Sequence, residues 1–141
     1  MKKFDEFNLD KEILKSLNIL NYNTPTEVQD KVIPKLIDKN NILVKSKTGT
    51  GKSASFAIPI CNQIKSLEKD LKALVIVPTR ELALQVKKEI ENIGRIKRIK
   101  CSAILGKDSF SNQVLELKQG VNVIVATPGR MIDHITKGSV D

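Results

Sequence analysis

A stretch of eight residues, Ser46-Lys47-Thr48-Gly49-Thr50-Gly51-Lys52-Ser53, has the residue types and spacing to bind phosphate. It follows the apolar run Ile42-Leu43-Val44 and precedes a segment with helical spacing, so we expect a strand, a loop and a helix start. Glycine adopts positive φ without steric cost, which lets backbone N–H groups converge on one phosphate. Lys52 would place an ammonium on the outer phosphates, Ser53 would offer its hydroxyl to Mg²⁺, and the helix dipole would favour the anion.

The match to the general phosphate-loop pattern G-x-x-x-x-G-K-[ST] is incomplete, because Ser46 occupies the position of the first glycine. A glycine-rich turn that only joins a strand to a helix is the alternative. The preceding apolar run and the Gly-Lys-Ser sequence favour phosphate binding.

The elements that must position this loop alternate between apolar strands and helical segments from residue 42 onward. Such βα repetition predicts an α/β fold with a parallel sheet flanked by helices. Before it we expect a helix from Asp10 to about Leu20 and another, opened by the capping box Thr24-Pro25-Thr26-Glu27, that reaches about Lys39. The expected strands are 42–45, 73–77, 101–105 and 121–125, and the later helices are 52–67, 79–93, 109–118 and 128–137.

Two further loops follow expected strands and carry groups that bind phosphate. Pro78-Thr79-Arg80-Glu81-Leu82 follows the second strand, and Thr127-Pro128-Gly129-Arg130 follows the fourth. Ligands of open parallel sheets bind outside the carboxyl ends of the strands, where these loops lie. Each offers N–H groups, a hydroxyl and a guanidinium at a helix start. Capped helix starts without a ligand remain the alternative for each loop.

Length and composition indicate a single soluble domain. The 141 residues carry 24 Lys and Arg against 16 Asp and Glu, a net charge of +8 that favours a polyanionic partner. A lysine-rich, solvated exterior would give the same charge, and the basic stretch 94–100 is expected to be a surface connection. Apolar runs are too short for a membrane span, the start does not resemble a signal peptide, and Cys61 and Cys101 have neither disulfide-framework nor zinc-site spacing. We expect reduced cysteines in the core of a cytoplasmic protein.

Taken together, these stretches resemble the DEAD-box family of ATP-dependent RNA helicases over essentially the whole chain. Asn21 to Gln29 is similar to the family's Q motif, with Phe4 at the upstream aromatic position. Ser46 to Ser53 is similar to motif I, and the two later loops to motifs Ia and Ib. The resemblance implies a partial N-terminal RecA-like P-loop NTPase domain at 1–141, with an adenine-recognition arm and Q motif at 1–29 and a βα core at 42–137.

The resemblance also implies roles for individual residues. Gln29 would contact adenine through two hydrogen bonds and Phe4 would stack on the base, while Lys52 and Ser53 would act on the phosphates and Mg²⁺ as the catalytic residues. The RNA contacts would be made to the backbone, so binding should depend on salt and weakly on sequence. The implied ATP-binding residues are Phe4, Gln29, Thr48, Gly49, Thr50, Gly51, Lys52 and Ser53, and the implied RNA-binding residues are Thr79, Arg80, Gly106, Lys107, Thr127, Gly129 and Arg130.

The chain departs from the family pattern in several places. Gly106-Lys107 stands where two glycines are frequent, and the chain ends at Asp141, before the Asp-Glu-Ala-Asp motif. We therefore expect the complete protein to hydrolyse ATP and to unwind RNA or remodel RNA–protein complexes, and this stretch alone to bind nucleotide weakly without hydrolysis. The second RecA-like domain would be missing, and the sheet would lack its middle strands and its C-terminal side. Exposed strand edges would favour non-native pairing or self-association.

We do not expect the remaining acidic residues or the histidine to take part in catalysis. Asp133 and His134 are expected to be exposed on a helix. A P-loop kinase or GTPase is a rival interpretation, but it does not predict the glutamine ahead of the loop or the Pro-Thr-Arg-Glu-Leu sequence. A non-catalytic nucleotide- and RNA-binding fragment remains an open alternative.

Overall fold

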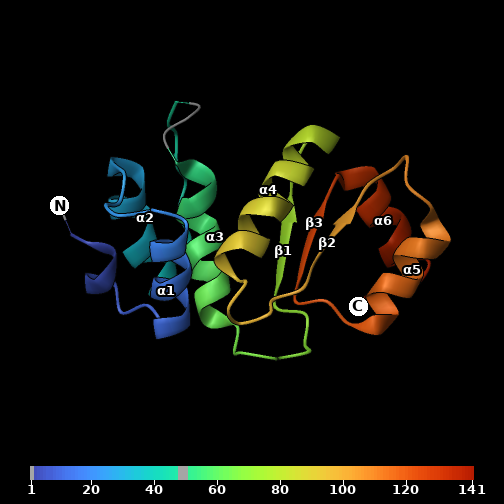
Figure 1. Cartoon of the computed structure of the whole chain (residues 1–141). Coiled ribbons are helices and arrows are strands. Elements are labelled where there is room, and N and C mark those ends of the chain that lie inside the picture. The colour runs from blue at the N-terminus through green and yellow to red at the C-terminus, as the bar shows by residue number, and fades with distance from the viewer. Residues whose placement is uncertain (1, 48–50) are drawn as a thin grey trace.

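The computed structural model describes residues 2–47 and 51–141. Helices precede the sheet, and strands then alternate with helices (Figure 1). The elements in chain order are the 3₁₀ turn η1 (Phe4–Glu6), α1 (Lys11–Ile19), α2 (Glu27–Ile37), α3 (Lys52–Gln63), β1 (Ala73–Ile76), α4 (Arg80–Ile93), β2 (Cys101–Ile104), α5 (Phe110–Gln119), β3 (Val123–Ala126) and α6 (Pro128–Thr136).

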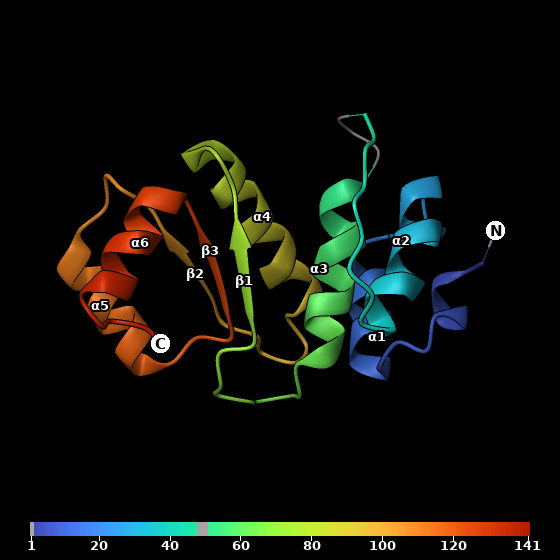
Figure 2. The ribbon, with the colours of Figure 1, turned by 180° about the vertical axis from the view of Figure 1, so that it is seen from behind.

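The three strands form a parallel sheet in the order β1-β3-β2. Val75 of β1 and Ala103 of β2 both stand opposite Val125 of β3, so the three strands run in register. Their carboxyl ends lie at the same edge of the molecule as the N-terminus of α3 (Figures 1 and 2). The predicted α/β fold with a parallel sheet flanked by helices is therefore confirmed.

The central strand β3 is covered on both faces. Val123 and Val125 belong to a large apolar cluster with α3 and α4, whereas Ile124 and Ala126 pack with Met131 of α6. All four residues of β3 are completely buried. A near-continuous apolar sequence is typical of a strand in a parallel sheet with helices on both faces, because side chains on both sides of the strand are buried, as in β3.

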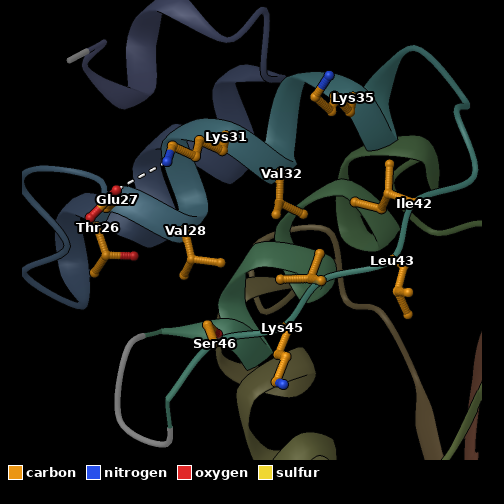
Figure 3. Close-up of a pocket in the computed structure, with 11 residues that line it drawn as sticks. Thr26, Glu27, Val28, Lys31, Val32, Lys35, Ile42, Leu43, Lys45 and Ser46 are labelled. Atoms are coloured by element: carbon orange, nitrogen blue, oxygen red, sulfur yellow. Dashed lines mark hydrogen bonds and ion pairs between the residues drawn. The ribbon is translucent and has the colours of Figure 1, made fainter.

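The predicted strand at 42–45 is wrong, because residues 41–47 are coil. α3 lies between this segment and β1 (Figures 1 and 2), so no strand hydrogen-bonds to it among the described residues. Leu43 is 100% exposed, and a pocket of about 760 Å³ lies between this segment and the valines of α2 (Figure 3). An apolar run becomes a strand only where a neighbour accepts its backbone hydrogen bonds.

β1 is an edge strand whose outer face is not covered. Leu74 and Ile76 are each 49% exposed, on the face of the sheet that α6 covers only near β3 and β2. The two faces of β1 therefore differ, and the prediction of a sheet covered on both faces fails at this strand.

The stretch 94–100 was expected to be a surface connection, but its Lys97 is almost completely buried, at 1% exposure. Its ammonium donates to the carbonyl oxygens of Cys61, Asn62 and Ile64 at 2.7–3.1 Å and to Asp10 Oδ2 at 2.7 Å. Those carbonyls belong to the C-terminal end of α3, where a cation is favoured by the helix dipole. Lys97 thus fastens the last turn of α3 to the start of α1.

Replacing Lys97 by methionine should lower the free energy of unfolding by about 3 kcal/mol, because it leaves buried carbonyl oxygens without a donor. Asp10→Asn should cost about 1 kcal/mol or less, since the Asp10 side chain is half exposed. Urea unfolding followed by circular dichroism measures both. The matched substitution Lys88→Met, at an exposed position of α4, should leave stability nearly unchanged. Equal effects of the two lysine substitutions would contradict this role.

Candidate functional site

A cleft of about 1360 Å³ collects the described residues that were predicted to bind nucleotide. The N-terminal segment and α2 form one wall, the start of α3 forms the base, and β1 with α4 forms the other wall. Thr48, Gly49 and Thr50 lie outside the described residues. The predicted residues that line the cleft are Phe4, Gln29, Gly51, Lys52 and Ser53.

Gln29 is 6% exposed and connects α2 to the phosphate loop. Its Oε1 accepts from the Thr26 N–H at 3.0 Å, and its Nε2 donates to the Gly51 carbonyl at 3.3 Å. Thr26 and Gln29 form the capping box of α2, in place of the predicted box at Thr24 to Glu27. One N–H and one lone pair of the amide remain for a ligand, because an amide has two donors and an oxygen acceptor with two lone pairs.

Gly51 has φ +85° and is the N-cap of α3. The expected positive φ is confirmed at this glycine. A Cβ atom here would lie 2.6 Å from Gln29 Nε2 and 3.0 Å from Thr26 Oγ1, so the close approach of α2 also requires glycine. The glycine joins the amide of Gln29 to the start of α3 without space for a side chain.

Lys52 and Ser53 open α3 directly after this glycine. Lys52 Nζ donates to the Ser46 carbonyl at 2.7 Å, which brings the two ends of the loop together. The N-terminus of α3 offers backbone N–H groups and the positive end of the helix dipole at the same point. The side chains of Lys52 and Ser53 and the first turn of α3 therefore lie at the base of the cleft.

The aromatic wall of the cleft includes a residue that sequence reasoning missed. Phe4 packs edge-on against Phe7, with ring centroids 6.1 Å apart, and is 5% exposed. Tyr22 donates its hydroxyl to Glu89 Oε1 at 2.9 Å, and burial together with Glu89 raises the pKa of Tyr22 to about 12. Tyr22 lies within the stretch Asn21 to Gln29, so its position in that motif could have indicated that it lines the cleft.

A second cluster joins the three loops after β1, β2 and β3. Arg80 Nη1 forms an ion pair with Asp108 Oδ1 at 2.9 Å, which links the first and second loops. Arg130 Nη1 donates to the Asp108 carbonyl at 2.8 Å, and its Nη2 donates to the Gly106 carbonyl, which links the second and third loops. Thr79 caps α4 by accepting from the Leu82 N–H, and Thr127 is the N-cap of α6. The predicted RNA-binding residues thus lie at one edge of the sheet.

Gln113 and His134 were not predicted to take part in this cluster. His134 was expected to be exposed, but it is completely buried, so that expectation is wrong. Its ring stacks on Phe110, with centroids 4.1 Å apart, and its Nε2 lies 2.7 Å from Gln113 Oε1. Asp133, its neighbour, is 61% exposed as expected.

Gly106 and Gly129 are exposed glycines that the fold does not require. Neither has a positive φ, and a Cβ atom at either position would meet nothing within 4 Å. A glycine at such a position leaves room for the close approach of another molecule.

The sequence model of the DEAD/DEAH box helicase family matches residues 26–141. The chain belongs to this family. Relatives of this DEAD/DEAH box helicase chain include the ATP-dependent RNA helicase DbpA of Bacillus subtilis, 49% identical over 99% of the chain. The ATP-dependent RNA helicase CshA of Listeria monocytogenes is 38% identical over 97% of the chain. The matched regions are 29% and 26% of those two proteins, so the chain spans less than a third of their length.

Solved structures of DEAD-box proteins share the fold of this helicase-family chain. A DEAD box protein from Methanococcus jannaschii superposes with a TM-score of 0.90 at 37% identity, over 99% of this chain and 38% of that one. A hypothetical ATP-dependent RNA helicase from Sulfolobus tokodaii gives 0.86 at 35% identity, over 94% of this chain and 38% of that one. The RecA-like interpretation of this α/β fold is supported over nearly the whole chain.

Two other kinds of site are absent from residues 2–47 and 51–141 of this helicase chain. No group of three or more His, Cys, Asp or Glu residues there is arranged to hold a metal ion. In the same ranges, each helix is too short or too polar to cross a bilayer.

The burial of His134 predicts a pH-dependent stability for this DEAD/DEAH box chain. Desolvation, with Arg130 nearby, lowers the pKa of His134 below its ordinary value of 6.5, although exposed Asp133 opposes the shift. Below about pH 6.5 the unfolded chain binds a proton that the folded chain does not, so stability should fall with decreasing pH.

Thermal unfolding between pH 7.5 and 5.5 measures this dependence. Because His134 is the single histidine of the chain, His134→Gln should flatten the profile, and its amide can still donate to Gln113. Identical slopes for the native protein and the variant would contradict the assignment.

Proposed function

We propose that this chain is the nucleotide- and RNA-backbone-binding unit of an ATP-dependent RNA helicase, which hydrolyses ATP in the complete protein. The observation that carries the proposal is the arrangement of two sites at one edge of the sheet. One is the cleft with Gln29, Gly51 and Lys52; the other is the three-loop cluster with Arg80 and Arg130. The names of the relatives, both ATP-dependent RNA helicases, support this function over a non-catalytic binding fragment.

In the proposed nucleotide site, Gln29 reads adenine with the N–H and the lone pair that Thr26 and Gly51 leave free. A glutamine amide matches the adjacent donor and acceptor of adenine, whereas guanine presents acceptors there. Phe4 lies in the same cleft and stacks on the base. ATP is therefore favoured over GTP.

The phosphates would lie at the start of α3. The conformation of Gly51 and the ammonium of Lys52 fit a triphosphate, and Thr48, Gly49 and Thr50 complete the proposed cradle. Lys52 exchanges the Ser46 carbonyl for a phosphate oxygen. Mg²⁺ would neutralise phosphate charge, and Ser53 is its proposed ligand in this chain.

The proposed RNA contacts go to the sugar–phosphate backbone. Arg80 and Lys107 supply charge, Thr79 and Thr127 supply polar groups at helix starts, and Gly129 permits close approach. Arg130 and Gly106 belong to the same cluster. Affinity should therefore fall steeply with salt and depend little on base sequence.

Further elements of the proposal concern the surroundings of this unit. A second RecA-like domain would complete the helicase, and the location would be the cytoplasm. The exposed face and edge of β1 would allow the isolated chain to self-associate.

Calorimetric titration of the 141-residue chain with ATP and with GTP tests the nucleotide site. Gln29→Ala should weaken ATP binding about tenfold and abolish the preference over GTP, because two base contacts are lost. Lys52→Ala should weaken both nucleotides equally, since it contacts phosphates alone. Gln63→Ala, at the exposed far end of α3, is the matched control and should change neither affinity. An unchanged base preference in Gln29→Ala would contradict the adenine assignment.

Gly129→Ala separates fold from RNA binding, because the two effects have opposite signs. Alanine in the first turn of α6 should stabilise the protein by about 0.5–1 kcal/mol, since its Cβ meets no protein atom. The same Cβ should obstruct the RNA backbone and weaken binding of a labelled oligouridine severalfold in fluorescence anisotropy. Thr136→Ala, at the exposed end of α6, should leave RNA affinity unchanged. Full RNA affinity in Gly129→Ala would remove Gly129 from the interface.

A further inference from the structure

We infer that Gln113 is a positioning residue for the RNA site: its buried amide holds the guanidinium of Arg130 in the orientation that meets the RNA backbone. The inference rests on the proposed function and assigns a role to a residue that lies outside the motifs. Gln113 does not contact RNA itself, because it is 2% exposed and lies on α5 beneath the loops.

The orientation of the Gln113 amide is determined by its own hydrogen bonds. Its Nε2 donates to the Leu105 carbonyl at 2.8 Å, so its Oε1 points toward α6. There Oε1 accepts from Arg130 Nη1 at 3.0 Å and lies 2.7 Å from His134 Nε2. Since the amide oxygen can only accept, His134 Nε2 must carry its hydrogen. Both lone pairs of one buried oxygen are therefore used on α6.

Arg130 is held in a defined plane by these contacts. Both Nη1 hydrogens are used, one on Gln113 and one on the Asp108 carbonyl, and Nη2 donates to the Gly106 carbonyl. The centroid of the Phe110 ring lies 5.5 Å from the guanidinium carbon, and the ring is itself stacked on His134. Of the five N–H groups of a guanidinium, the second Nη2–H and the Nε–H remain. Nε is 3.7 Å from Asp133 Oδ2 at the exposed side of the cluster.

Such an arrangement favours binding of a backbone phosphate in two ways. A guanidinium already fixed in one plane loses less conformational freedom on binding than a mobile one. The same guanidinium also holds the carbonyls of Gly106 and Asp108, and Asp108 pairs with Arg80, so the three loops keep their spacing. Gln113 therefore acts through Arg130 on the whole interface.

Packing alone does not account for Gln113. A buried amide is costly to desolvate, and an apolar residue of similar size would fill the space between α5 and α6 at lower cost. Its hydrogen bonds go to a strand end and to a cationic side chain, which is the pattern expected of a residue that orients another.

A double-mutant cycle on the full 141-residue chain tests the inference. The variants are Gln113→Met, Arg130→Ala and the pair, and the readout is the dissociation constant of a fluorescein-labelled single-stranded oligouridine by anisotropy. Gln113→Met should weaken binding about fivefold when Arg130 is present and should have no effect in Arg130→Ala. Gln119→Met, the same substitution at the exposed end of α5, should leave binding unchanged. An equal loss in both backgrounds, or no loss with Arg130 present, would overturn the inference.

A measurement on the unsubstituted protein covers the case in which Gln113→Met does not fold. In ¹⁵N NMR of the arginine side chains, rotation of the Arg130 guanidinium should be slow compared with that of exposed Arg95 and Arg98. Equally fast rotation of all three would overturn the inference without reference to RNA. If the native chain binds no oligouridine at low salt, the proposed RNA function fails and this role fails with it. RNA binding without coupling in the cycle would overturn the positioning role alone.

Discussion

The hydrogen bonding of β3 between β1 and β2 is the constraint on which the rest of the structure depends. Because the strands are parallel and in register, the three loops that follow them emerge at one edge of the sheet. The complete burial of β3 makes this arrangement stable on both faces. Arg80, Asp108 and Arg130 come from separate parts of the chain, and they meet because the sheet aligns their strands. A single ladder of hydrogen bonds therefore brings together the three loops of the proposed RNA-binding surface.

The cleft depends on a different interaction, the approach of α2 to the start of α3 at Gly51. The amide of Gln29 bonds to the glycine carbonyl and also closes the capping box of α2, so one side chain belongs to both elements. A base contact at Gln29 would therefore act directly on the residue that precedes Lys52. At its other end α3 is held by Lys97, which also bonds to Asp10. The helix that carries the proposed phosphate contacts is thus fixed at both ends to the N-terminal segment.

The features that were predicted correctly are those that depend on residue type and on spacing along the chain. The parallel sheet, the positive φ at Gly51 and the capped helix start at Thr79 follow from spacing and residue type. The failures share a different cause. Lys97 and His134 look like exposed polar residues, but acceptors or aromatic partners distant in sequence bury them. Residues 42–45 have strand composition, yet a strand needs a neighbour, and the structure places α3 between this segment and β1.

The polar side chains of the two sites also have different partners within the protein, which affects how each site would bind its ligand. Lys52 bonds to the backbone carbonyl of Ser46, so a nucleotide would replace a neutral acceptor of the protein by a charged phosphate. Arg80 instead faces a carboxylate of its own chain, and a phosphate must compete with that charge. The Arg80–Asp108 pair is about half exposed, so solvent weakens it and the competition costs little. Arg130 bonds instead to carbonyls and an amide, and the nearest carboxylate of the described residues that pairs with it, that of exposed Asp133, lies 3.7 Å from its Nε, beyond hydrogen-bond distance. In the proposed RNA interface, the largely buried Arg130 would therefore be the fixed contact, and the half-exposed Arg80 the one that can change its partner.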